Sequence, residues 1–302
     1  MNNNATSPHT LVDDPQLRQQ VIEFLNIVEA ENGIAPFSEQ FMLGLSDARL
    51  GHEHFLSFSE GRLIGVLALD RAAAVPVAEV AVKADGVEVA DSLISGLGTT
   101  VDVWSHGVGA VGRLEGAQTV RELLVMALDK RVESPMVPEH LTVLNLAESR
   151  VRWGEFVDAE FLRVNNEAFD WHPEQGHWDQ SRWERAQEAE WFDPAGVLLL
   201  WSGVDVEGST TLQGFHWTKC VKSQPVNDTR ILGEVYVVAL SDAARGQGLG
   251  KVITLLGVDY LQKNGSEQVI LYVEADNAAA VTVYERLGFA VKESHVLYRF
   301  SN

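Results

Sequence analysis

The chain has 302 residues, a formal net charge of -20 and 46% hydrophobic residues, a composition ordinary for a globular protein of one large or two medium domains. This acidity argues against nucleic-acid binding, because phosphate backbones require clustered basic side chains. It also disfavours docking to an anionic membrane. A neutral or cationic small molecule fits this surface better, although solubility alone also explains the acidity.

Apolar residues at helical spacing predict an amphipathic helix over residues 15–32. Two β-rich segments, 54–59 and 63–69, are separated by Glu60-Gly61, which predicts a β-hairpin. Further elements expected in the first half are strands at 75–82 and 101–104 and helices at 91–98 and 117–128. The last helix is predicted from Leu123, Leu124 and Ala127, which could pack together on one side.

Two prolines, Pro135 and Pro138, mark the best domain boundary and predict domains at 1–135 and 141–302. The second half is expected to hold strands at 141–146, 196–201, 212–220, 233–240, 269–274 and 296–300, and helices at 158–169, 180–190, 249–263 and 278–287. Both halves then follow a similar order of helix, hairpin, strand, helix, strand and helix. This repeated pattern predicts a duplicated α/β domain.

The cellular location is predicted from the cysteine content and the start of the chain. Cys220 is the one cysteine, so no internal disulfide is possible. The first ten residues lack the basic and apolar segments of a secretory signal, and no apolar run approaches the roughly 20 residues of a membrane span. We therefore expect a monomeric cytoplasmic protein that does not bind membranes.

A glycine-rich turn carries the chemistry of the second half. The strand that ends at Leu240 leads into Arg245-Gly246-Gln247-Gly248-Leu249-Gly250 and then a helix, where backbone N–H groups can bind phosphate. A P-loop would need glycine at 245 and Ser or Thr at 252, and a dinucleotide fingerprint would need a different glycine spacing. Taken alone, the segment is equally compatible with a structural turn that has spare glycines.

The spacing Arg245-x-x-Gly248-x-Gly250 resembles the [Gln/Arg]-x-x-Gly-x-[Gly/Ala] motif of GCN5-related N-acetyltransferases. Asn277, Tyr284 and the following Leu287-Gly288-Phe289 match the usual companions of this motif. The resemblance implies an α/β fold of the α+β type, with two tandem acetyltransferase domains. Each would be a mixed, mostly antiparallel sheet flanked by helices, and acetyl-CoA would be the co-substrate.

A more specific resemblance, to the mycothiol synthase family of tandem acetyltransferases, covers nearly all of residues 141–300. The matching segments are 172–176, 191–196, 214–219, 233–238 and 271–277, with looser matches at 35–40 and 104–107. The resemblance implies acetyl transfer to the cysteinyl amine of a cysteinyl-glucosaminyl-inositol. An acetyltransferase for another amine or a peptide N-terminus, and a non-catalytic acyl-CoA sensor, remain alternatives, although the presence of both Glu234 and Tyr284 argues against the sensor.

The resemblance also implies roles for individual residues. Glu234 would be the general base, acting through a water, and Tyr284 the general acid toward the departing thiolate. The acceptor would be bound by Glu39, Glu174, Lys219, Glu234 and Tyr272. The coenzyme would be bound by Val238, Ala239, Leu240, Arg245, Gly246, Gln247, Gly248, Leu249, Gly250, Lys251, Asn277, Ala278, Ala279, Ala280, Val281 and Thr282.

Two further expectations concern ligands. No metal is expected, because His52-Glu53-His54 and the histidines at 172 and 177 do not have the spacing of a zinc site. The segment 83–88 of the first half corresponds to the glycine-rich loop but has a single glycine and two acidic residues, Asp85 and Glu88. Because these charges repel a pyrophosphate, the first half is predicted to have lost or weakened coenzyme binding.

Overall fold

The computed structural model describes residues 8–107, 110–171, 175–204, 209–222 and 231–301. Its strands are β1 (Glu53–Ser59), β2 (Arg62–Asp70), β3 (Val77–Val82), β4 (Val101–His106), β5 (Gln118–Leu128), β6 (Leu141–Asn145), β7 (Val197–Ser202), β8 (Thr211–Lys222), β9 (Ile231–Leu240), β10 (Gln268–Glu274) and β11 (Ala290–Phe300). Its α-helices are α1 (Pro15–Asn32), α2 (Glu39–Gly44), α3 (Val87–Ser95), α4 (Leu146–Trp153), α5 (Phe156–Ala168), α6 (Gln180–Ala186), α7 (Leu249–Lys263) and α8 (Ala278–Leu287).

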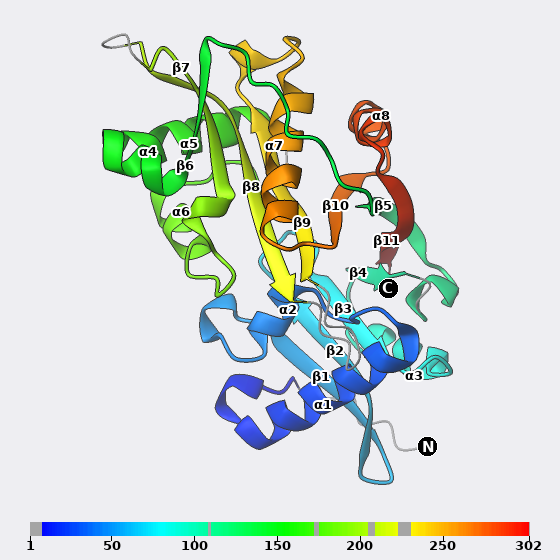
Figure 1. Cartoon of the computed structure of the whole chain (residues 1–302). Helices are drawn as coiled ribbons and strands as arrows, with labels where there is room; N and C mark the ends of the chain where they lie inside the picture. Colours follow the sequence, from blue (N-terminus) through cyan, green and yellow to red (C-terminus); the bar gives the residue numbers. More distant parts are fainter. Residues whose placement is uncertain (1–7, 108–109, 172–174, 205–208, 223–230, 302) are drawn as a thin grey trace.

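One eleven-stranded sheet runs through the whole molecule in the order β1-β2-β3-β4-β11-β5-β10-β9-β8-β7-β6. Neighbouring strands are antiparallel except in two pairs, β3 with β4 and β9 with β10, which are parallel. Helices pack along this sheet in both halves (Figure 1). The expectation of a mixed, mostly antiparallel sheet flanked by helices is confirmed, with the two halves sharing a single sheet.

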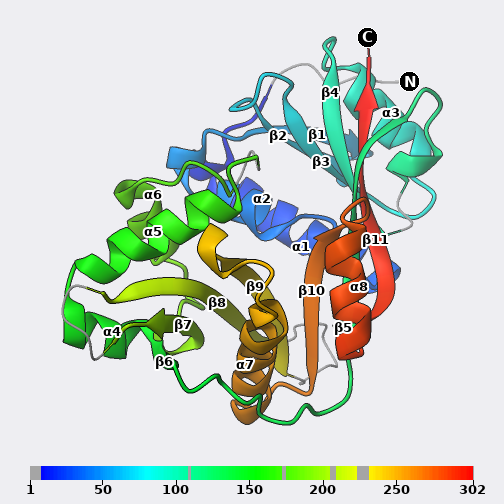
Figure 2. The same ribbon diagram turned by 90° about the horizontal axis from the view of Figure 1, so that it is seen from above.

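The two halves exchange strands at the centre of this sheet. β11, from the end of the chain, lies between β4 and β5, while β5 of the first half lies between β11 and β10 (Figures 1 and 2). Across the seam, the Arg299 guanidinium donates two hydrogen bonds of 2.7 Å to the Asp102 carboxylate. Each half therefore depends on the other for its central strand pairing, and the predicted boundary between 135 and 141 stays a prediction.

The helix predicted over 117–128 is wrong, because these residues form strand β5. β5 pairs with β10 along one edge and with β11 along the other. Residues Leu123, Leu124 and Ala127 have helix-like spacing, but they belong to a continuous apolar run, which is also typical of a strand in the middle of a sheet. Pairing with β10 and β11 makes this segment a strand. The order of elements in the first half therefore ends in a strand and not in the predicted helix.

Other predicted elements are present with small shifts of their ends. The hairpin of β1 and β2 is confirmed, as are α1, α7 and α8. Helix α1 begins where the Asp14 side chain accepts a hydrogen bond from the Leu17 N–H, and it ends at Gly33 in the left-handed region. The short helices α2 and α4 were not predicted. Among the described residues, no helix is long and apolar enough to cross a membrane.

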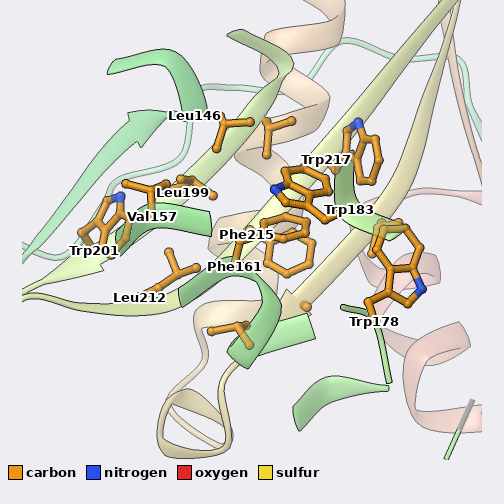
Figure 3. Close-up of a cluster of buried hydrophobic side chains, with 14 residues drawn as sticks. Leu146, Val157, Phe161, Trp178, Trp183, Leu199, Trp201, Leu212, Phe215 and Trp217 are labelled. Atoms are coloured by element: carbon orange, nitrogen blue, oxygen red, sulfur yellow. The ribbon is translucent and has the colours of Figure 1, made fainter. Parts of the chain in front are cut away.

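Aromatic side chains form the core of the second half, between α5, α6 and the strands β7 and β8 (Figure 3). Phe161 stacks on Trp183 with ring centroids 4.0 Å apart and contacts Phe215 at 4.2 Å. Trp183 meets Trp217 of β8 edge to face at 5.2 Å. These large buried rings contribute strongly to stability and hold β8 in a fixed position.

Candidate active site

The sheet opens between the two parallel strands of the second half. β10 pairs with β9 from Gln268 opposite Leu232 to Leu271 opposite Val235, whereas β9 continues to Leu240. On its other edge β9 has a bulge, because Trp217 of β8 lies opposite Val237 while Thr218 lies opposite Val235. The end of β9 therefore presents backbone groups that β10 does not pair, and such groups are available to a ligand.

A cavity of about 570 Å³ lies at this opening. Its lining includes several residues predicted to bind the coenzyme, namely Val238, Ala239, Leu240, Arg245 and Asn277. The opposite wall is formed by residues 167–171, at the end of α5 and just after it. The structure thus brings together coenzyme candidates from β9, the glycine-rich loop and the start of α8.

The glycine-rich loop leaves the start of α7 open. Gly246 and Gly248 both have a φ of 76°, a conformation that glycine adopts at no steric cost. Gly248 is the N-cap of α7 and supplies no side-chain hydrogen bond to the first turn. Arg245 forms a 2.9 Å ion pair with Asp242 at the loop. The unpaired N–H groups and this arginine suit a phosphate.

The remaining coenzyme candidates lie around these two helix starts. Gln247 donates a 2.7 Å hydrogen bond to the Ala243 carbonyl, and the Asn277 side chain caps α8 by accepting from the Ala280 N–H at 3.1 Å. The other candidates lie in the N-terminal halves of α7 and α8, namely Leu249, Gly250, Lys251, Ala278, Ala279, Val281 and Thr282.

Three residues predicted to bind the acceptor meet at the junction of the two halves. Lys219 of β8 lies directly opposite Glu234 of β9, with its Nζ 3.7 Å from Glu234 Oε2. The same ammonium is 2.5 Å from Glu39 Oε2, at the start of α2 in the first half. Glu39 also accepts a 2.5 Å hydrogen bond from the Trp191 indole. One cation is therefore shared by two carboxylates from different halves.

The environment of Glu234 prepares it to accept a proton. Burial raises the pKa of Glu234, the nearby Lys219 ammonium lowers it, and the Glu39 carboxylate raises it, with a net increase above the ordinary value. A carboxylate whose pKa lies closer to neutrality is a better general base for an ammonium substrate. The general-base role of Glu234 stays a prediction.

Two aromatic residues at this site were missed in the sequence. The Trp191 and Tyr236 rings flank Lys219, whose Nζ is 4.9 Å and 5.5 Å from their centroids. Trp191 belongs to a segment that carries the family resemblance, and Tyr236 is two residues from Glu234 on the same strand. Alternation along a strand could have identified Tyr236, because residues i and i+2 share a face.

The two predicted tyrosines lie on different elements. Tyr272 of β10 remains partly exposed, and its partial burial, followed by the Glu234 and Glu293 carboxylates, raises its pKa. Tyr284 of α8 is half-buried against an apolar cluster that includes Val238, and burial raises its pKa as well. Both tyrosines therefore keep their protons at neutral pH, and because a raised pKa makes a weaker acid, donation requires an acceptor as basic as a departing thiolate. Glu174 lies outside the described residues.

In the first half the two parallel strands also stop pairing before one of them ends, but the segment that follows differs from the glycine-rich turn of the second half. β3 and β4 are parallel, and their pairing ends where Glu79 lies opposite Trp104, although β3 continues to Val82. The following Lys83 pairs with Glu31 at 2.8 Å. Weak or absent coenzyme binding here stays a prediction, and a calorimetric stoichiometry of two acetyl-CoA per chain would contradict it.

Residues 162–289 match the family model described as Acetyltransferase (GNAT) family. The chain is 41% identical to a mycothiol acetyltransferase of Corynebacterium aurimucosum, over 97% of this chain and 98% of that protein. It is 39% identical to the mycothiol acetyltransferase of Corynebacterium glutamicum (strain R), over 94% of each chain.

Solved structures show the same fold at low sequence identity. A GCN5-related N-acetyltransferase from Sphaerobacter thermophilus aligns with a TM-score of 0.67 at 20% identity, over 98% of this chain and 94% of that one. A tandem GNAT protein from the clavulanic acid biosynthesis pathway aligns with a TM-score of 0.66 at 17% identity, over 98% and 97% of the two chains. One solved protein with the same fold is thus itself a tandem GNAT protein.

Proposed function

The chain belongs to the mycothiol acetyltransferase family and is an acyltransferase that uses acetyl-CoA, and from this premise we propose that it acetylates the cysteinyl amine of cysteinyl-glucosaminyl-inositol. This reaction is the last step of mycothiol biosynthesis. The observation that carries the proposal is the shared placement of Glu39, Lys219 and Glu234 beside the opening of β9.

This arrangement suits an acceptor with one amine and many hydroxyls. The carboxylates of Glu39 and Glu234 attract an ammonium, and Lys219 can donate hydrogen bonds to hydroxyl oxygens. Because Glu39 comes from the first half and the other two residues from the second, the acceptor is held where the halves meet. Tyr272 supports the same pocket, and we assign Glu174 to it from the family resemblance.

The proposed reaction uses Glu234, the end of β9 and Tyr284 one after another. Acetyl-CoA supplies the acetyl thioester. Glu234 takes a proton from the acceptor ammonium, directly or through a water, so that the nitrogen can attack the thioester carbonyl. Backbone N–H groups at the unpaired end of β9 stabilise the developing oxyanion. When the tetrahedral intermediate collapses, the C–S bond breaks and Tyr284 gives its proton to the departing sulfur. The nitrogen, which becomes the amide, releases its remaining extra proton to solvent, and Tyr284 takes a proton back from solvent.

We propose the coenzyme site at the 570 Å³ cavity, with the pyrophosphate at the loop from Arg245 to Lys251 and the pantetheine along Val238 to Leu240. Residues 277–282 of α8 would complete it. We further propose domains at 1–135 and 141–302, each contributing to the exchanged sheet. A cytoplasmic monomer that binds neither nucleic acid nor membrane is consistent with the acidic charge and with acetyl-CoA as co-substrate.

The experiment compares Glu234→Gln with Glu267→Gln, a matched charge change at an exposed position of the same half. Loss of a general base is expected to lower kcat/KM for the cysteinyl acceptor by about 10²–10⁴-fold. The control should keep the rate of the unmodified protein, and acetyl-CoA binding should be kept in both variants. An unchanged rate for Glu234→Gln would refute its role, and turnover with other amines alone would refute the acceptor.

A further inference from the structure

Two histidines meet across the exchanged strands, outside the residues already assigned to the reaction. His106 of β4 and His295 of β11 are direct partners in the sheet, and their Nδ1 atoms are 2.9 Å apart. The far nitrogens face carboxylates: His106 Nε2 is 3.1 Å from Glu79 Oε1, and His295 Nε2 is 3.3 Å from Glu293 Oε1. Both imidazoles are about 10% exposed, and the His295 Nε2 contact is a hydrogen bond, whereas His106 Nε2 is close to the Glu79 carboxylate without hydrogen-bond geometry.

These contacts determine how many protons the pair holds. His295 Nε2 carries a proton because it hydrogen-bonds to the Glu293 carboxylate. His106 Nε2 lies 3.1 Å from the Glu79 carboxylate without hydrogen-bond geometry, and a proton there is favoured because a bare lone pair would be repelled by the negative charge. Two Nδ1 atoms at 2.9 Å need one proton between them, because two lone pairs would repel and two protons would clash. The two rings together therefore carry three protons, which gives the pair a single positive charge.

The cluster touches the acceptor site at two places. The second oxygen of Glu79 accepts a 2.6 Å hydrogen bond from the Ser38 N–H, directly before Glu39 at the start of α2. The His295 ring lies edge-on to Tyr272, with centroids 5.6 Å apart. One end of the cluster thus fixes the backbone beside Glu39, and the other supports the ring of Tyr272.

We propose that His106 and His295 share one proton and, as a single cation between Glu79 and Glu293, position Glu39 and Tyr272 to bind the acceptor. Both histidines are positioning residues, since they act through these neighbours. The proposal rests on the proposed function for the identity of the acceptor, whereas the proton count follows from the cluster alone.

The charge of the pair responds to pH. The groups that face it are Glu79 from β3, Glu293 from β11 and Tyr272 from β10. Burial, followed by the neighbouring His106, lowers the pKa of His295, although the Glu293 and Glu79 carboxylates raise it, so a positive charge on the His295 ring itself is disfavoured. When acid forces a fourth proton onto the pair, both Nδ1 atoms become donors and their hydrogen bond is lost. Acceptor affinity is therefore expected to weaken on the acid side, while acetyl-CoA affinity does not.

Two substitutions at one position separate the hydrogen bond from the charge. In His295→Asn, the side-chain amide lies near the place of Nδ1 and can donate to His106 without adding a proton, whereas His295→Leu removes the contact. We expect His295→Leu to raise KM for the acceptor roughly tenfold, as for loss of a charge-assisted hydrogen bond, and His295→Asn to raise it only about twofold. KM for acetyl-CoA should stay within about twofold in both.

The pH profile and a matched control complete the kinetic test. His295→Asn should lose the acid-side weakening of acceptor binding, and His140→Asn, at an exposed histidine, should behave as the unmodified protein. Equal effects of Asn and Leu, or equal increases in both KM values, would overturn the positioning role.

A nitrogen NMR titration of the histidines in the unmodified protein tests the proton count without any variant or assay. We expect one pair of coupled imidazoles with a single added proton near neutral pH. Two neutral rings would overturn the proposal. Absence of activity with the cysteinyl acceptor would instead refute the proposed function and leave the titration result unaffected.

Discussion

Replacing Lys219 with methionine tests the electrostatics of the site most sharply. Methionine keeps much of the length of the side chain but removes the cation that lowers the pKa of Glu234. Burial and the Glu39 carboxylate then act unopposed, so the pKa of Glu234 should rise further. More of Glu234 would be protonated near neutral pH, and the base would be unavailable in that fraction.

The distance sets the magnitude of this effect. A pair of unit charges at the 3.7 Å between Lys219 Nζ and Glu234 Oε2 interacts by about 4 kcal/mol at an effective dielectric constant of about 20. Glu39 lies closer to the same ammonium and offsets part of this interaction. If about half remains, the rate on the acid limb of the pH profile, where Glu234 is mostly protonated, should fall at least about tenfold and recover as the pH rises.

The assay is the pH profile of kcat/KM for the acceptor. Lys219→Met should move the acid limb to higher pH, and Glu39→Gln should move it to lower pH, because the latter removes a charge that raises the pKa of Glu234. Lys263→Met, at a largely exposed lysine of α7, is the matched control and should leave the limb in place. A limb that does not move, or moves in the same direction in both active-site variants, would show that these charges do not control the pKa of Glu234.

Three further predictions concern the acid, the exchanged strands and stability. Tyr284→Phe should lower kcat at least about tenfold without raising KM for acetyl-CoA, and an unchanged kcat would remove Tyr284 from the mechanism. Residues 141–302 expressed alone should lack cooperative unfolding, because β5 is missing from the sheet. Co-expression with residues 1–135 should restore cooperative unfolding, and a fragment 141–302 that folds stably by itself would contradict this prediction. Burial lowers the pKa of His54 and His216 to about 4, below the ordinary 6.5, so their stabilisation is complete above 6.5 and is lost as pH falls toward 4. Urea unfolding at about pH 5 should show a loss of about 2 kcal/mol per histidine relative to neutral pH, and substituting either residue with asparagine should reduce that loss; equal pH dependence in the variants would speak against it.

Local patterns predicted most of the fold. Helix α1 is bounded by Asp14 and Gly33, and α7 by Gly248 and Asn264. The ends of both helices could therefore be predicted from capping residues. Strand β5 was mistaken for a helix because its environment is supplied by β10 and β11, which come more than a hundred residues later. The strand exchange depends on the same distant pairings, and no local pattern encodes it.

The site was predicted unevenly for the same reason. The loop at Arg245 and the strand at Glu234 are contiguous motifs, so the family resemblance located them. The contact of Glu39 with Lys219 joins residues 180 positions apart, and only the resemblance suggested that both bind one substrate. His106 and His295 carry no motif, and their contact depends on the exchange of β11 into the sheet beside β4.

An acceptor competition tests the central claim most directly. Acetyl-CoA is supplied with equal amounts of cysteinyl-glucosaminyl-inositol and glucosaminyl-inositol, which lacks the cysteinyl amine, and the products are identified by mass spectrometry. We expect one product, acetylated on the cysteinyl nitrogen, formed by the unmodified protein and greatly reduced in Glu234→Gln. Acetylation of the glucosamine nitrogen, or the same product at the same rate in the variant, would contradict it.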